Sequence, residues 1–338
     1  MRKTLLAFVA MVAALALAPS ASAVKFGEPD RTNQYPWVGL MVAVDDDGEP
    51  LWRCTGSLLS PDLFLTAGHC VGDPQADPGD QPAKVYLWFT TGAEVINTDP
   101  QYAINLAYQA TLSDEDAEAF NVCLGDPTKT DAQGKPLFPV LGYPCGGYDA
   151  WGLPQSYELW TGSLTIPQTY DVGVVYDLQW TPHPTTLQGH PFTQPTTYGT
   201  LADVGTLDAL AATRGKGNIQ FTVVGYGLQS VKPVESADKQ RMVGTVSFVN
   251  MQSALNCERP NVTNPNCWNL HYSNNPGQGH GGSGGTCFGD SGGPVLYQGE
   301  IVAVNSFVLN LNCNGAGFGY RVDTSLVYAF LTSFGYTP

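Results

Sequence analysis

The chain is poor in positive charge: its 15 Lys and Arg residues face 30 Asp and Glu residues, which gives a formal net charge of -15 at pH 7. Nucleic acids and anionic membrane surfaces attract basic proteins, because their own charge is negative. The scarcity of basic residues therefore argues against nucleic acid and membrane as partners. Acidic clusters such as 45–47 and 114–116 are explained by solubility in surface loops.

Long hydrophobic runs are also scarce, and the single one spans Leu5 to Leu17 near the N-terminus. It is too short to cross a bilayer. Arg2 and Lys3 precede it and the small residues Ala21-Ser22-Ala23 follow it, which is the pattern of a secretory signal peptide. We expect residues 1–23 to be removed after Ala23 and the remaining protein to be secreted and extracellular.

Segments with the apolar period of a helix are few, whereas Gly, Pro, Thr, Val and Tyr are abundant. This composition predicts a mostly β protein. After removal of residues 1–23 the chain is long enough for one large or two small cores. Strands are expected at 37–44, 51–59, 241–250 and 301–308, and a helix is expected at 324–334.

The eight cysteines are an even number in a chain expected to be exported, which predicts four disulfides. Their spacing alone leaves the pairing open.

The octet CFGDSGGP at 287–294 places Ser291 between glycines. A serine hydroxyl is a poor nucleophile and needs a base on its oxygen and donors for the oxyanion that it creates. The glycines let the backbone take a tight, partly left-handed path that directs N–H groups into one small space. A Gly-rich surface turn is the plainer reading of GDSG, but the preceding Cys287 and the apolar residues after Gly293 favour a nucleophile.

This octet resembles the active-serine segment of the trypsin and chymotrypsin-like serine proteases, and TAGHC at 66–70 resembles the histidine segment of the same family. The resemblance implies two six-stranded antiparallel Greek-key β-barrels, an active site in the cleft between them, and a short C-terminal helix beside the second barrel. It also implies a secreted serine endopeptidase that hydrolyses peptide bonds through an acyl-enzyme.

The resemblance makes His69 the general base. A histidine titrates near neutral pH, so it can take a proton from the serine and return it to the leaving amine. No metal is expected at the other histidines, whose spacing matches no zinc pattern: His183, His190, His271 and His280.

The segment YDVGVV at 170–175 resembles the strand that carries the third residue of the family's Ser-His-Asp triad. Asp171 is therefore the expected aspartate, which accepts from the ring of His69, fixes its tautomer and stabilises the imidazolium. Asp177 on the same stretch is the rival, and the plainer role for it is a turn acid at the end of the strand.

By resemblance, the backbone N–H groups of Gly289 and Ser291 form the oxyanion hole. Cleavage after Ala23 would give Val24 an α-ammonium group, which in this family pairs with the aspartate before the serine, here Asp290. Signal cleavage would then be the activating step, with no separate propeptide. The alternative is that Val24 is only the first residue of a strand.

The resemblance also selects disulfide partners: Cys54 with Cys70, Cys257 with Cys267, and Cys287 with Cys313. Cys123 and Cys145 remain for each other, inside a segment that the family does not normally have.

The expected domains are a first barrel at 24–180 with a disulfide-stapled insertion around 97–160, a linker at 181–207, and a second barrel with the C-terminal helix at 208–338. The acidic loop at 71–80 lies where some relatives bind calcium, but its ligand spacing is not that of an EF-hand. Calcium is therefore possible but not predicted, and no other cofactor is expected.

The resemblance assigns a substrate pocket to three segments of the second barrel. Gly285 stands where trypsin-like members carry an aspartate, so nothing in the pocket offsets the desolvation of Arg or Lys. Val308 stands where a glycine would leave a deep slot, which favours a small or medium apolar side chain before the scissile bond. Ser306 is expected beside the triad aspartate, and the backbone of 306–308 is expected to pair with the substrate. The pocket residues are Gly285, Thr286, Ser306, Phe307, Val308 and Gly317.

A catalytically silent or highly restricted protein that binds through the same scaffold is the alternative, because a fold does not fix a function. Such proteins usually lose the nucleophile, the base or the oxyanion glycine, and all three are present here. The expected partners of an active enzyme are protein or peptide substrates, and we expect a monomer.

Overall fold

The computed structural model describes residues 24–44, 50–71, 84–89, 108–110, 157–160, 164–167, 171–176, 178–179, 195–228, 241–253, 268–274 and 284–338. The expected signal peptide, most of the 71–80 loop and most of the expected insertion and linker lie outside these residues. Asp177, His183, His190, His280 and four cysteines also lie outside them. These cysteines are Cys123, Cys145, Cys257 and Cys267.

Six antiparallel strands close into a barrel in the C-terminal half of the chain. Their order is β12-β11-β14-β15-β16-β13, and pairing of β13 with β12 completes the ring. The short β1 near the N-terminus adds to β12 from outside. The bounds are β1 Glu28–Pro29, β11 Gln220–Gly225, β12 Met242–Ser253, β13 Trp268–Ser273, β14 Pro294–Tyr297, β15 Glu300–Val308 and β16 Ala316–Arg321.

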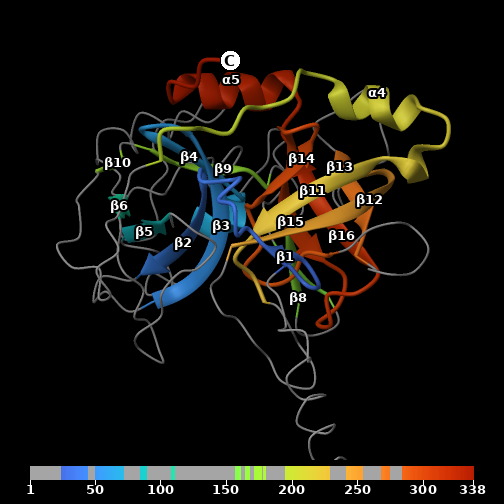
Figure 1. Ribbon diagram of the computed structural model, residues 1–338, viewed down its shortest axis with the longest axis horizontal. Coiled ribbons are helices and arrows are strands. Elements are labelled where there is room, and N and C mark those ends of the chain that lie inside the picture. Colours follow the sequence, from blue (N-terminus) through green and yellow to red (C-terminus); the bar gives the residue numbers. More distant parts are fainter. Residues whose placement is uncertain are drawn as a thin grey trace, which may run out of the picture.

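A second antiparallel sheet is built from the N-terminal half, in the order β10-β6-β5-β2-β3-β4-β9. One residue separates β9 from β10 in the chain although they lie at opposite edges of the sheet, so the sheet must curve round toward closure. The two sheets lie side by side (Figure 1). The bounds are β2 Val38–Val44, β3 Pro50–Ser60, β4 Leu63–Thr66, β5 Lys84–Trp88, β6 Tyr108–Ala110, β9 Gly173–Tyr176 and β10 Leu178–Gln179, and a separate hairpin consists of β7 Tyr157–Trp160 and β8 Leu164–Pro167.

The all-β fold class predicted from the resemblance is thus confirmed. The strands expected at 37–44, 51–59, 241–250 and 301–308 are found as β2, β3, β12 and β15, with ends that differ by up to three residues. The sequence marks them well because apolar residues crowd them: from Val38 to Ala43 every residue of β2 is buried. Each large apolar side chain buried in this way contributes about 1.5–3 kcal/mol.

The helices within the described residues are short and lie outside the sheets. They are α2 Gly68–Val71, α4 Thr206–Ala212, the 3-10 turn η2 Lys216–Asn218 and α5 Ser325–Ser333. The predicted C-terminal helix is α5, and its N-cap Thr324 accepts a hydrogen bond from the backbone of Val327. The resemblance placed this helix beside the second barrel. It also covers the first sheet, where the ring of Phe334 lies 4.8 Å from that of Tyr176 (Figure 1).

The N-terminal segment is fastened to the second barrel, although it precedes the first. Besides the pairing of β1 with β12, the buried Asp30 accepts from the buried Arg241 guanidinium at 2.9 Å. Asp30 also accepts from the backbone N–H groups of Gln34 and Tyr35. The first residues after the expected cleavage site are therefore held next to the C-terminal barrel.

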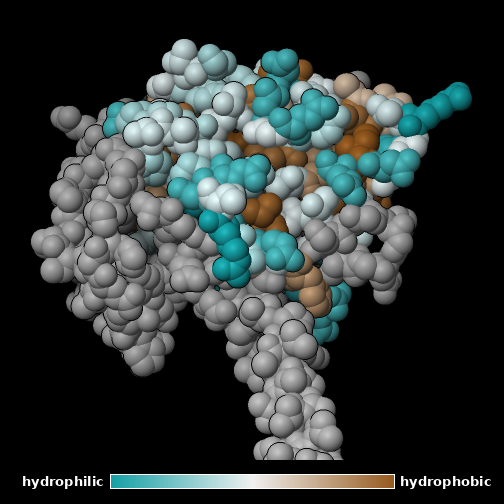
Figure 2. All heavy atoms as spheres, viewed as in Figure 1, coloured by the Kyte–Doolittle hydropathy of each residue, from teal (hydrophilic) through white to brown (hydrophobic). Residues whose placement is uncertain are grey.

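Much of the described surface on the face shown in Figure 2 is polar, with hydrophobic atoms showing between the polar side chains. No helix among the described residues is long and apolar enough to cross a membrane.

Candidate active site

Ser291 lies in a tight loop between Cys287 and β14, and the disulfide of Cys287 with Cys313 fastens this loop. Gly289 and Gly292 on either side of it have φ values of +92° and +79°, which residues with a Cβ rarely adopt. A Cβ at Gly292 would also overlap the side chain and backbone of the first sheet, at Thr66 and Thr55. Both the turn and the close approach of the two sheets therefore require glycine at 292.

The backbone N–H groups of this loop divide into two kinds. Those of Asp290, Gly292 and Gly293 donate to carbonyl groups of Cys287, Asn305 and Asp290. Those of Gly289 and Ser291 donate to no group in the part of the chain that the structure describes. Two donors next to the serine oxygen are thus left for another acceptor.

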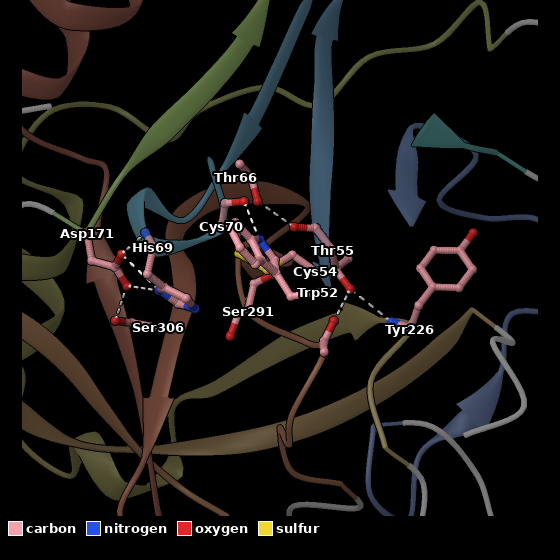
Figure 3. Close-up of a disulfide and its surroundings, with 11 residues drawn as sticks. Trp52, Cys54, Thr55, Thr66, His69, Cys70, Asp171, Tyr226, Ser291 and Ser306 are labelled. Atoms are coloured by element: carbon pink, nitrogen blue, oxygen red, sulfur yellow. Dashed lines mark hydrogen bonds and ion pairs between the residues drawn. A yellow bond between two sulfur atoms is a disulfide. The ribbon is translucent and has the colours of Figure 1, made fainter. Parts of the chain in front are cut away.

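Thr55 of β3, which the sequence did not single out, joins this loop to the first sheet. Its hydroxyl donates to the carbonyl of Gly289 at 2.8 Å and accepts from the N–H of Tyr226 at 3.0 Å. Its own N–H donates to the carbonyl of Ser291 at 2.8 Å. Through these two carbonyls the first sheet fixes the orientation of the serine loop (Figure 3).

His69 lies in the single turn α2, directly after β4, and the disulfide of Cys54 with Cys70 ties this turn to β3. Its ring Nδ1 is 3.0 Å from both carboxylate oxygens of Asp171, and its backbone N–H donates to the same carboxylate at 2.9 Å. In Figure 3 the ring lies between Asp171 and Ser291. The structure therefore brings together the three residues that the resemblance named.

Asp171 is buried, with 4% of its surface exposed. Burial by itself raises the pKa of such a carboxyl, but the charge of His69 and hydrogen bonds from His69 and the Ser306 hydroxyl outweigh it, so the pKa of Asp171 is lowered. The group remains ionised at neutral pH. It can therefore hold the ring of His69 in one orientation, with its other nitrogen, Nε2, available to Ser291.

Asp290 is completely buried behind the serine. Its carboxylate accepts from the N–H groups of Gly227 and Cys287, each at 2.8 Å. Burial raises the pKa of Asp290 to about 7, although these two N–H groups and the charge of Arg53 lower it. A buried carboxylate in this state gains from a nearby cation.

Uncharged groups line the segments expected to form the substrate pocket. Asn274, just after β13, makes two hydrogen bonds with the backbone of Thr286, at 2.8 and 3.0 Å. The carboxamide of Asn274 also fills the space beside Gly285, where a Cβ would lie 3.0 Å from it. The ring of Tyr272 borders Gly317 in the same way, because a Cβ there would overlap it.

The remaining expected pocket residues lie along β15. Ser306 donates to Asp171. Phe307 stacks on Phe318 with ring centroids 4.6 Å apart. Val308 is buried against the disulfide of Cys287 with Cys313. Tyr272 and Asn274 were missed because no motif marks β13, and only its pairing with β12 and β16 brings it to the pocket.

One group of possible metal ligands comes together in the described residues, namely Cys54, His69 and Cys70. Both cysteines form a disulfide with each other and therefore offer no thiolate, so this group is not suited to hold a metal ion.

The comparisons with known proteins bear on the family and the fold. The family model described as Trypsin matches residues 24–125 and 193–329. CLIP domain-containing serine protease B10 of Anopheles gambiae is 33% identical over 55 residues, which are 16% of this chain and only 15% of that protein.

Among solved structures, a scabies mite inactivated protease paralogue, S-D1, matches with a TM-score of 0.50 and 12% identity over 93% of this chain and all of the other. HL collagenase matches with a TM-score of 0.48 and 16% identity over the same shares. Such low identities bear on the fold alone.

The two roles of Gly292 predict a large effect of Gly292→Ala on stability. The matched control is Gly299→Ala, because Gly299 has a φ of +93° but nothing within 4 Å of its would-be Cβ. The control should lose only the cost of the left-handed backbone, about 1–2 kcal/mol. Gly292→Ala should lose more than about 3 kcal/mol, because backbone of the first sheet must also move. Urea unfolding of the two variants measures the difference, and equal losses would contradict the close approach.

Proposed function

The chain belongs to the trypsin family, and we propose that it is a secreted serine endopeptidase that hydrolyses peptide bonds of proteins or peptides through an acyl-enzyme. The observation that carries the proposal is the arrangement of Asp171, His69 and Ser291 beside two uncommitted backbone N–H groups.

In the proposed mechanism, the Ser291 Oγ attacks the scissile carbonyl carbon while Nε2 of His69 takes its proton. The tautomer is supported by the contact of Nδ1 with Asp171, which leaves Nε2 as the base. The oxyanion accepts from the N–H groups of Gly289 and Ser291, and one such donor is worth about 3–4 kcal/mol in the transition state. His69 then protonates the leaving amine, and water attacks the acyl-enzyme by the reverse sequence of proton transfers.

Activation by signal cleavage is part of the proposal, and the surroundings of Val24 support it. The Val24 side chain is fully buried in the second barrel, against Gly244 and Gly284, where there is no Cβ to obstruct it. Lys25 forms an isolated β-bridge with Gly285, a few residues before Asp290. The first residues of the cut chain are thus seated next to the segment that holds the buried carboxylate.

The backbone of Val24 also favours a cut at this position. Its φ is +47°, which is unfavourable for a β-branched residue and costs on the order of 1–3 kcal/mol. The strain exists only while residue 23 is bonded to the nitrogen of Val24, because φ is measured from the carbonyl carbon of that residue. Cleavage would remove this strain and supply the ammonium that Asp290 lacks.

We propose a pocket that rejects Arg and Lys and accepts small or medium uncharged side chains. The absence of charge on Gly285, Thr286, Tyr272 and Asn274 supports this, since a buried cation without a partner is costly. The apolar preference expected from the sequence remains a prediction. The proposal that the protein is secreted rests on the signal-peptide pattern of residues 1–23. We propose a monomer because the residues of the candidate site all come from one chain.

The proposal predicts that an organophosphate or sulfonyl fluoride labels the purified protein and that Ser291→Ala abolishes both labelling and peptide hydrolysis. The intact mass before and after reagent measures the labelling, and a set of unstructured peptides measures the hydrolysis. A correctly folded protein that is neither labelled nor active would instead be a catalytically silent binding protein. Labelling with hydrolysis of small esters but not of casein would indicate a restricted enzyme.

Asp171→Asn should lower kcat by about four orders of magnitude, because in a Ser-His-Asp triad the asparagine leaves the histidine in the wrong tautomer. Asp177→Asn is the matched control on the same stretch and should change kcat little. Steady-state kinetics on one peptide substrate compares them. The reverse ranking would move the role to Asp177.

The pairing of Val24 with Asp290 predicts how stability depends on pH before and after cleavage. In the uncut chain the folded pKa of Asp290 is about 7, against about 3.9 for a free Asp. Between these values the unfolded chain has lost a proton that the folded chain retains, so the stability of the uncut chain falls as pH rises from about 4 to 7. The ammonium should keep Asp290 ionised in the cut protein and remove this slope.

Urea unfolding from pH 4.5 to 7.5 measures how the free energy of unfolding changes with pH. It is applied to protein whose N-terminus is sequenced as Val24 and to an uncut chain in which Ala23→Arg blocks the cut. Uncut protein that also carries Asp290→Asn should lack the slope, because the Asn side chain does not ionise. Arg53 and Tyr272, which interact electrostatically with Asp290, are unchanged in all three proteins. Equal slopes in cut and uncut protein would refute the ion pair.

A further inference from the structure

The proposed substrate pocket contains a buried donor that nothing in the described chain uses. Asn305 is 2% exposed, and its Nδ2 makes no hydrogen bond with the residues that the structure describes. A buried amide without a partner costs about 1–3 kcal/mol relative to a bonded one. Such a group is retained most readily where a ligand supplies the partner.

The location of Asn305 places it between the nucleophile and the pocket. Its backbone exchanges hydrogen bonds with Gly292 and Gly293, at 2.7 and 2.8 Å, immediately after Ser291. The next residue, Ser306, contacts Asp171. On the other side, the Oδ1 of Asn305 accepts from the hydroxyl of Tyr272 at 2.8 Å.

Tyr272 links Asn305 to the other pocket walls. Its hydroxyl is 2.9 Å from Oγ1 of Thr286, next to Gly285, and its ring borders Gly317. All three segments that line the proposed pocket therefore meet at one buried polar chain, Thr286–Tyr272–Asn305. Polar groups thus lie where the segments assigned to the pocket meet, and the apolar preference expected from the sequence stays a prediction for the test below to decide.

The directions of these hydrogen bonds define what the polar chain can still bind. Tyr272 gives its single proton to Asn305, so the Thr286 hydroxyl must donate to Tyr272. This leaves the N–H groups of Asn305 Nδ2 as donors and the oxygen of Thr286 as an acceptor. If the Asn305 carboxamide is turned over, Tyr272 donates to Thr286, Oδ1 becomes the acceptor and the Thr286 hydroxyl the donor. Either arrangement offers one donor and one acceptor.

We propose that this pocket selects a primary carboxamide, so that the enzyme cleaves after Gln or Asn, with the substrate amide bridging Asn305 and Thr286. This inference rests on the proposed function. A primary carboxamide is the neutral protein side chain that carries a donor nitrogen and an acceptor oxygen on the same carbon, so it matches both orientations of Asn305. A site built for such bonds discriminates strongly against an apolar isostere, because the isostere leaves the buried groups unpaired.

A carboxylate would pair with only half of this site. It has no N–H for the acceptor that the polar chain leaves free, and it would bring a charge to side chains, those of Thr286, Tyr272 and Asn305, that carry none. Asp and Glu are therefore disfavoured as substrates.

The test uses fluorogenic peptides that differ only at the residue before the scissile bond, in the size-matched pairs Gln with Met and Asn with Leu. The ratio of kcat/KM within a pair is the measured quantity, and organophosphate titration of Ser291 counts the active molecules. We expect the amide to be favoured by about tenfold to hundredfold in at least one pair. In Asn305→Leu this ratio should fall to about 1 or below.

Two further variants keep the test decisive. Thr286→Val is isosteric, removes the other half of the site and should also reduce the ratio, even if Asn305→Leu does not fold. Asn218→Leu, at an exposed position in η2 outside the pocket, is the matched control and should leave the ratio unchanged.

The outcomes separate the two proposals. Equal cleavage after amide and apolar residues by a protein that is labelled at Ser291 overturns the carboxamide pocket and leaves the protease intact. A preference for the amide that survives both Asn305→Leu and Thr286→Val also overturns it. A folded protein that is neither labelled nor active removes the proposed function, and the pocket proposal with it.

Discussion

Burial of the Asp290 carboxylate is the constraint on which the rest of the site depends. The group lies in the same loop as Ser291 and is wholly enclosed, so its charge has to be met by protein groups. Two backbone N–H groups, from Gly227 and Cys287, do part of this. The carboxylate also occupies the space beside Gly225 and Gly227, where a Cβ would overlap it. One buried carboxylate thereby explains the glycines at the end of β11 and the conformation of the serine loop.

The serine loop is hydrogen-bonded to both sheets. This explains why the loop has a well-defined geometry although it belongs to neither sheet. The first sheet holds it by Thr55, which binds the carbonyls of Gly289 and Ser291. The second holds it by Asn305, whose backbone binds Gly292 and Gly293. The N–H groups of Gly289 and Ser291 remain without an acceptor among the described residues, because neither Thr55 nor Asn305 binds them. The two uncommitted donors are thus a consequence of how the loop is fastened, and their positions depend on both sheets at once.

The sequence points to candidate site residues where a few adjacent residues must make one local shape. CFGDSGGP and TAGHC single out Ser291 and His69 as candidates because the turn, one cysteine of a disulfide and a strand end lie within or beside each motif. Asp171 was harder because its segment is short and Asp177 is close to it, and the choice is supported by a contact with His69 across 102 residues. Thr55 and Tyr272 could not be found, since each acts on residues more than ten positions away in the sequence. Their roles follow from strand register, which a single sequence does not fix.

The proposed pocket draws on more segments of the chain than the family motifs mark. Gly285 without a carboxylate and Val308 in place of a glycine predict an uncharged, shortened pocket, and apolar specificity is the natural expectation from those two positions. Tyr272 enters from β13, however, and brings a hydroxyl to a place that neither position reveals. That hydroxyl also accounts for Asn305, since a buried carboxamide needs a partner for its Oδ1. Once both are present, an apolar substrate side chain would leave Nδ2 of Asn305 unpaired, whereas an amide would complete the set. The preference proposed for this pocket therefore rests on the balance of its buried donors and acceptors, more than on the size of its lining residues.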